Sequence, residues 1–119
     1  MTSSFGYASD APSRGAIDAL RGTALLEFGT DWCGHCLASA PIISKALAAH
    51  PAVQHLKVED GHGRALGRSF QVKLWPTLIF LANGNEVARL VRPTDGHAVA
   101  QALAAIDPID PIDPIDPAQ

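Results

Sequence analysis

Short apolar runs alternate with segments of helical periodicity along this chain, and this alternation predicts an α/β architecture. Three of the runs suit buried strands, at residues 23–28, 53–59 and 77–82. Asn83-Gly84 follows the third run and is a strong signal for a tight hairpin, so that residues 86–91 return as an antiparallel strand. Parallel strands followed by such a hairpin predict a mixed sheet.

Four helices are expected between and around these strands. They cover residues 13–21, about 35–49, 63–70 and 95–106. Ser13 can cap the first helix, and Thr94 or Asp95 can cap the last. In the longest helix, Leu37 and Ile43 belong to a set of small and apolar residues at helical spacing, which predicts an inward face.

The 119 residues are enough for one domain, which we expect over residues 13–106. Residues 1–12 are small and polar and predict a flexible lead. Residues 107–119 continue a segment in which Ile-Asp-Pro occurs four times in a row, starting at Ile106. Proline at every third position prevents helix and sheet hydrogen bonding, so this tail is predicted to be disordered.

Charge and hydropathy exclude two classes of partner. The formal net charge is −3, but four of the twelve acidic residues lie in the last thirteen positions, so the body is nearly neutral. A near-neutral body argues against nucleic acid as the main partner, and no apolar run is long enough for a membrane span. The first residues carry neither a basic nor an apolar signal region, which favours a cytoplasmic location. Nothing in the sequence requires more than a monomer.

Cys33 and Cys36 are the only cysteines, and they fall where a predicted strand passes into a predicted helix. The first sulfur is then expected at the helix N-terminus, where unpaired N–H groups favour its thiolate. The second sulfur lies one turn further on and can attack a mixed disulfide made by the first. This spacing predicts a redox-active dithiol.

Zinc is the alternative ligand for two cysteines at this spacing, but zinc usually needs two more protein ligands. The chain has no third cysteine, and His50 and His55 are expected to flank a turn rather than to form a ligand pair. We therefore expect no metal and no cofactor besides the Cys33–Cys36 disulfide.

The residues from Phe28 to Cys36 read Phe-Gly-Thr-Asp-Trp-Cys-Gly-His-Cys and resemble the active-site segment of the thioredoxin family. Trp75-Pro76-Thr77 looks like the cis-proline loop of that family, and Pro41 lies where thioredoxins kink the active-site helix. The resemblance covers about residues 13–106. It implies a thioredoxin fold, a three-layer α/β/α sandwich with a mixed central sheet.

The resemblance also implies roles for individual residues. Cys33 is expected to be the attacking thiolate and Cys36 the resolving thiol. Pro76, in a cis peptide bond, is expected to face the dithiol, while Trp32 covers it as an apolar shield. Substrate contacts are implied for Trp32, Gly34, Trp75, Pro76 and Arg92.

Glu27 lies where many thioredoxins carry a buried acid behind the resolving cysteine, and Lys57 takes the family's position for a lysine near that acid. Through water, Glu27 could take the proton of Cys36 during resolution. The alternative is that Glu27 points to solvent at the end of its strand.

His35 lies between the cysteines, where histidine resembles the loop of protein disulfide isomerases. A histidinium there would stabilise the Cys33 thiolate and make the disulfide more oxidising; the alternative is an exposed residue with little effect. The chain also departs from the family pattern, because Arg92-Pro93 replaces a glycine at which partners dock. A walled, basic groove is expected, which puts the standard partners, including a thioredoxin reductase, in doubt.

These features together predict a thiol–disulfide oxidoreductase that exchanges disulfides with protein substrates, as a reductase supplied by an upstream electron donor. Two alternatives remain at this point. One is an oxidase or isomerase, which His35 favours. The other is a non-catalytic binding or chaperone module on the same fold, which has no need of an intact dithiol.

Overall fold

The computed structural model describes residues 6–108, and its elements follow the order expected from the sequence. They are α1 (Arg14–Asp18), β1 (Thr23–Gly29), α2 (Gly34–Leu47), β2 (Gln54–Glu59), α3 (Ala65–Ser69), β3 (Thr77–Ala82), β4 (Asn85–Val91) and α4 (Gly96–Ile106). The predicted disordered tail lies outside the described residues from residue 109 onwards, as do residues 1–5 of the predicted lead.

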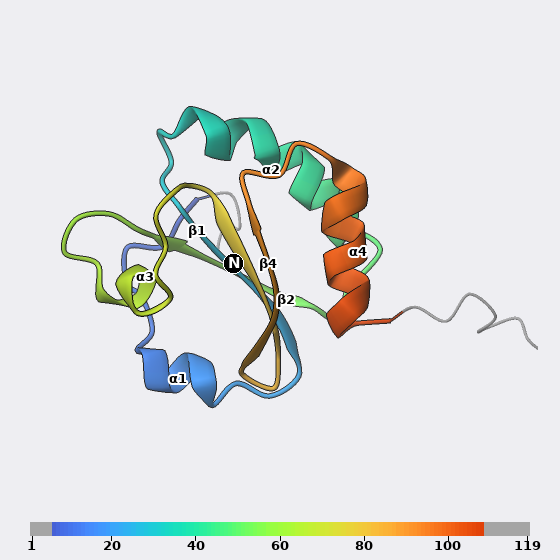
Figure 1. Ribbon diagram of the computed structural model, residues 1–119, viewed down its shortest axis with the longest axis horizontal. Coiled ribbons are helices and arrows are strands. Elements are labelled where there is room, and N and C mark those ends of the chain that lie inside the picture. Colours follow the sequence, from blue (N-terminus) through green and yellow to red (C-terminus); the bar gives the residue numbers. More distant parts are fainter. Residues whose placement is uncertain (1–5, 109–119) are drawn as a thin grey trace, which may run out of the picture.

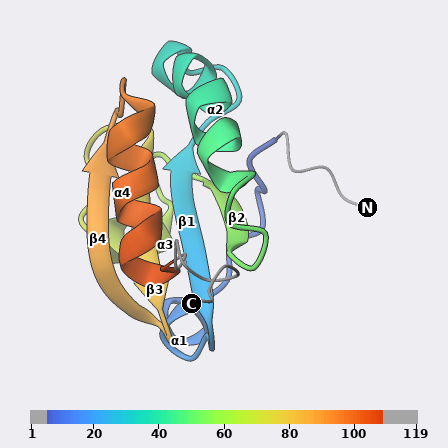
Figure 2. The ribbon, with the colours of Figure 1, turned by 90° about the vertical axis from the view of Figure 1, so that its right-hand side faces the viewer.

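The four strands form one sheet in the order β2-β1-β3-β4. β1 pairs with β2 in parallel and with β3 in antiparallel orientation, and β3 pairs with β4 as an antiparallel hairpin. Figures 1 and 2 show α1 and α3 on one face of this sheet and α2 and α4 on the other. The mixed sheet and the three-layer α/β/α sandwich are therefore confirmed.

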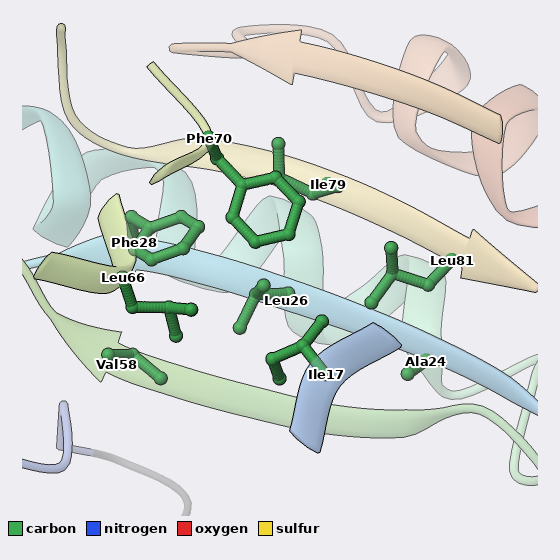
Figure 3. Close-up of a cluster of buried hydrophobic side chains, with 9 residues drawn as sticks. All are labelled: Ile17, Ala24, Leu26, Phe28, Val58, Leu66, Phe70, Ile79 and Leu81. Atoms are coloured by element: carbon green, nitrogen blue, oxygen red, sulfur yellow. The ribbon is translucent and has the colours of Figure 1, made fainter. Parts of the chain in front are cut away.

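Strand β1 is buried on both faces, because it lies between two strands and between two layers of helices. Leu26 and Phe28 point into the cluster under α1 and α3, which Figure 3 shows. Leu25, one residue out of step, points into the second cluster, which includes Ile43 of α2 and Leu103 of α4. Alternate residues of β1 thus pack into the hydrophobic clusters on opposite faces of the sheet. Nearly every residue of β1 is therefore buried.

The hairpin between β3 and β4 turns through Asn83 and Gly84, which have φ angles of 50° and 80°. Two successive positive φ values are typical of the tight turn expected for Asn-Gly. A Cβ atom at Gly84 would lie 2.0 Å from the carbonyl oxygen of Asp18, so the close approach of the last residue of α1 also requires glycine here.

Helix α2 begins at Gly34 and continues through Pro41, and its buried face agrees with the predicted one at Ile43 but not at Leu37. Leu37 was expected to point inward and is 61% exposed, while Ser39 is buried. The buried stripe passes through Cys36, Ser39 and Ile43. Ser39 can be buried because its hydroxyl donates to the backbone oxygen of His35 at 2.9 Å, so its polar group is satisfied inside the helix.

The predicted flexible lead is wrong for the residues from Gly6 onwards. Ala8 forms a parallel bridge with Val58, and its N–H and C=O groups bond to Lys57 and Glu59 of β2, both at 2.9 Å. β2 is an edge strand with unpaired backbone groups, and this lead fills part of that edge. The segment around Ala8 is therefore part of the fold.

Candidate active site

At one end of the sheet, the ends of all four strands lie side by side and bring distant segments of the chain together. Phe28 pairs with Thr77, Thr77 pairs with Val91, and Gly29 pairs with Glu59. The dithiol loop after β1, the loop before β3 and the end of β4 therefore lie side by side, at the edge where α2 begins in Figure 1.

Cys33 is the N-cap residue of α2, and Cys36 lies one turn inside it. The Sγ atom of Cys33 accepts a hydrogen bond from the backbone N–H of Cys36 at 3.4 Å. Both cysteines are free thiols, and Cys33 is the more accessible, at 8% exposed against 2%. The helix start thus presents one sulfur and covers the other, as the sequence predicts.

The two thiols differ in acidity for identifiable reasons. Burial alone raises the pKa of Cys33, but hydrogen bonds from Cys36 and from the backbone of His35, with the charge of Arg92, outweigh it and lower that pKa. Burial, together with the neighbouring Cys33, raises the pKa of Cys36 to about 11. Cys33 is therefore the thiol of the pair that ionises more readily and acts as the nucleophile, whereas Cys36 keeps its proton near neutral pH.

Arg92 has an unusual backbone conformation beside the dithiol, with a φ angle of 51°. The left-handed region costs a non-glycine residue about 1–2 kcal/mol. Its backbone N–H donates to the oxygen of Pro76 at 2.9 Å, and its side-chain Nε donates to the oxygen of Trp75 at 2.8 Å. The side chain thus holds the loop before β3 and places a positive charge near Cys33.

We expect Arg92→Gln to raise the pKa of the Cys33 thiol, because the glutamine amide can still donate a hydrogen bond but carries no charge. The rate of alkylation by iodoacetamide, measured against pH, should move to higher pH in this variant. Arg21→Gln is the matched control, since Arg21 is exposed at the opposite end of β1. An equal shift in both variants, or none in Arg92→Gln, would contradict the role of the local charge.

The loop before β3 is held by a residue that the sequence did not reveal. Asp60, which follows β2 directly and is buried, accepts a hydrogen bond from the indole Nε1–H of Trp75 at 2.9 Å. The rings of Trp75 and Trp32 meet edge to face, with centroids 5.8 Å apart. The Trp75–Pro76 peptide bond is cis, which confirms that expectation. Trp32 is 73% exposed at the rim of the site.

Glu27 is buried, only 2% exposed, so the alternative in which it points to solvent is wrong. Its Oε2 atom accepts a short hydrogen bond from the hydroxyl of Tyr7, and its Oε1 atom lies 2.7 Å from Nε2 of His55. Lys57 pairs with Glu27 in the strand register, and its ammonium nitrogen lies 4.5 Å from the centre of the Tyr7 ring. The carboxylate is thus held from two sides below the dithiol.

Gly29 leaves the space in which this polar group meets the dithiol. A Cβ atom at this position would lie 2.6 Å from Sγ of Cys36 and 2.8 Å from the hydroxyl oxygen of Tyr7. Both atoms therefore border the same small volume against the backbone of β1, and any side chain at position 29 would displace them.

Comparison with known proteins decides the family. A sequence model described as Thioredoxin matches residues 13–105 of this chain. The chain belongs to the thioredoxin family. Thioredoxin-1 of Saccharomyces cerevisiae is 32% identical over 105 residues, which cover 88% of this chain and 98% of that protein. The thioredoxin fold and the thiol–disulfide oxidoreductase activity expected from the dithiol are thereby confirmed.

Two further relatives of this thioredoxin-family protein are informative. The structure of thioredoxin 2 from Pseudomonas aeruginosa PAO1 in its reduced form has a TM-score of 0.78 and 53% sequence identity, and the match covers 85% of this chain and 94% of that one. Human protein disulfide-isomerase A2 is 42% identical over 85 residues, which make up 66% of this chain but only 16% of that protein. The match thus spans a small part of the isomerase and nearly all of the Saccharomyces cerevisiae and Pseudomonas aeruginosa thioredoxins.

Sequence reasoning missed Tyr7 and gave His55 no role at this site. His55 lies two residues before Lys57 on β2, so its position on the face of Glu27 follows once the strand pairing is known. Tyr7 is the only tyrosine, but it lies in a segment without periodicity, and nothing local in the sequence predicts its contact.

His50 and His55, the two histidines considered as zinc ligands, have separate hydrogen-bond partners. His50 lies in the turn between α2 and β2 and bonds to Asp107 at 2.8 Å, whereas His55 bonds to Glu27. Within residues 6–108, no three histidine, cysteine or acidic side chains are grouped so that they could hold a metal ion. No helix in this part of the chain has the length and apolar character needed to cross a membrane.

Proposed function

We propose that this thioredoxin-family protein acts as a reductase of protein disulfides. Cys33 attacks a substrate disulfide, Cys36 resolves the mixed disulfide, and the oxidised protein is reduced again by an upstream reductase. The observation that carries this proposal is the contrast between the two thiols. Cys33 is the more accessible of the two and has a lowered pKa, whereas Cys36 is more deeply buried and has a raised pKa.

Glu27 is proposed as the base that receives the proton of Cys36 when the mixed disulfide is resolved. General bases of this kind typically accelerate proton transfer by about 10²–10⁴. Lys57, which pairs with Glu27 in the register, is proposed to offset part of the cost of a buried carboxylate. Both roles serve the release of substrate as a free thiol.

The substrate is proposed to lie as an extended segment along the loop of Trp75 and Pro76, across the exposed face of Trp32 and the backbone of Gly34. Trp32 is the most exposed of the large apolar side chains described, and exposed aromatic residues are typical anchors of protein partners. Arg92 adds positive charge at the same edge, which favours substrates with acidic residues near the disulfide.

The remaining proposals concern setting and assembly. A reductase needs a reducing compartment, so we propose that the protein works in the cytoplasm. Two cysteines three positions apart cannot join distant segments, which suits such a compartment. We further propose that it acts as a monomer.

The reduction potential, measured by equilibration with glutathione, tests the direction of the reaction. We expect a value near that of thioredoxins, roughly −270 mV, because a reductase must hold its dithiol reduced against its substrates. A value near that of protein disulfide isomerase, roughly −180 mV, would instead support the oxidase or isomerase alternative.

His35→Pro is expected to lower the reduction potential by part of the roughly 90 mV between those two classes. Proline is tolerated in the first helical turn, but it removes both the imidazole and a backbone N–H that stabilises the Cys33 thiolate. His35→Ala separates the two effects, since it removes only the side chain. An unchanged potential in both variants would show that His35 does not tune the dithiol.

A further inference from the structure

A small polar group lies beneath the dithiol and joins three segments that are distant in sequence. It consists of Tyr7 from the N-terminal lead, Glu27 from β1 and His55 from β2. Such a group is costly to bury unless every polar atom has a partner. Here each oxygen of the Glu27 carboxylate has one hydrogen-bond partner, so each of these hydrogen bonds can have a defined donor and acceptor.

Donor and acceptor chemistry fixes that direction. An ionised carboxylate can only accept hydrogen bonds, so the hydroxyl of Tyr7 and Nε2–H of His55 must both donate to Glu27. The oxygen of Tyr7 then keeps its lone pairs available for another donor. The hydroxyl group of this tyrosine can therefore accept a proton on one side while it gives a proton on the other.

Cys36 lies on the other side of the Tyr7 hydroxyl. Its Sγ atom and the Tyr7 hydroxyl border the same volume over Gly29, because a Cβ atom there would be within 3 Å of both. Burial, then the charge and hydrogen bond of Glu27, and then Cys36 raise the pKa of Tyr7. Tyr7 therefore stays protonated, and it suits a relay that is neutral before and after the transfer.

We propose that Tyr7 is a catalytic residue that carries the proton of Cys36 to Glu27 when the mixed disulfide is resolved. His55 is a positioning residue that holds the carboxylate toward the tyrosine. This inference rests on the proposed roles of the two cysteines and replaces the water between Cys36 and the acid with a side chain of this protein.

The step balances in atoms and electrons. The S–H proton of Cys36 passes to the Tyr7 oxygen as the Tyr7 proton passes to Glu27, and the new thiolate attacks Sγ of Cys33. The Cys33–Cys36 bond forms, the bond between Cys33 and the substrate sulfur breaks, and the substrate leaves with that electron pair as a thiolate. In this step the sulfur of Cys36 is oxidised, the leaving substrate sulfur is reduced, and Cys33 stays at the disulfide level.

A route to solvent exists for the proton held on Glu27. A surface pocket of about 480 Å³ is lined by Glu27, His55 and Lys57. Charged and titratable groups also face the relay from each surrounding element. They are Cys33 at the N-cap of α2, Lys57 over the Tyr7 ring, His55 on β2 and Asp31, which accepts from the backbone N–H of Tyr7.

Tyr7→Phe tests the relay, because phenylalanine keeps the ring and removes only the hydroxyl. The reduced protein is mixed with dithiobis(nitrobenzoate) in a stopped-flow instrument, and release of the coloured thiolate is followed. The first equivalent reports attack by Cys33, and the second reports resolution by Cys36. We expect the first phase to change less than twofold and the second to slow at least tenfold at pH 7.

The pH profile separates a relay from a structural effect. Without the hydroxyl, resolution depends on the small thiolate fraction of Cys36, so its rate should rise about tenfold per pH unit between pH 7 and 9. The parent should show a shallower rise over the same range. Equal rates in parent and variant, or a slowing that is the same at every pH, would overturn the relay.

His55 supplies the second arm of the experiment. His55→Leu removes the donor to Glu27 and is expected to slow only the second phase, with the steeper pH profile; His55→Gln keeps a donor and is expected to restore it. Identical behaviour of the two variants would overturn the positioning role. If the parent itself releases a single equivalent, resolution by Cys36 fails, and this result is distinct from failure of the Tyr7 relay.

Discussion

Turnover of insulin disulfides by dithiothreitol is expected to fall to the uncatalysed rate when Cys33 is replaced by serine. The lowered pKa of this thiol supplies the nucleophile, and a serine hydroxyl is not ionised near neutral pH. Cys36 cannot take over the role, since it is 2% exposed and its pKa is raised to about 11.

Cys36→Ser is the matched control for this loss, because it keeps Cys33 and the backbone N–H group of residue 36 that bonds to the Cys33 sulfur. We expect this variant to form a mixed disulfide with a substrate protein and to retain it, which non-reducing electrophoresis detects. Turnover by Cys33→Ser at the parental rate would contradict the assignment of the nucleophile.

Phe28→Ala is expected to lower the free energy of unfolding by about 3–5 kcal/mol. Phe28 is fully buried in the cluster under α1 and α3, with its ring 5.8 Å from that of Phe70. The cavity opens in the central strand next to Glu27 and Gly29, so activity should fall together with stability. Urea unfolding followed by circular dichroism measures the change.

Val87→Ala provides the comparison for this loss of stability. Val87 is on the edge strand β4 and is 48% exposed, so the truncation should change the free energy of unfolding by less than about 1 kcal/mol. Similar losses in the two variants would mean that the cluster around Phe28 does not dominate the stability of the fold.

The parts of the structure that sequence predicted correctly are those that depend on local signals. The strands of the central sheet follow from short apolar runs, the hairpin from Asn83-Gly84, and the caps from Ser13 and Asp95, whose side chains accept from the following N–H groups. The placement of Cys33 at the start of a helix is equally local, because it follows from the predicted strand-to-helix junction and from the three-residue spacing of the two cysteines.

The parts that sequence missed depend on contacts between distant residues. Tyr7 and Glu27 are 20 positions apart, and His55 and Glu27 are 28 apart, so no period along the chain reveals their meeting. Leu37 shows the opposite error, because helical spacing alone does not say which side of the helix faces the sheet. Ser39 occupies the inner side since its hydroxyl bonds within the helix.

The edge-to-face pair of Trp32 and Trp75 has an optical consequence. These are the only two indoles in the 119 residues, and both lie beside the dithiol. All indole emission from the protein therefore originates within one small region, and a change at the neighbouring sulfurs acts on both emitters at once. We therefore expect indole fluorescence to report whether the dithiol is reduced or oxidised.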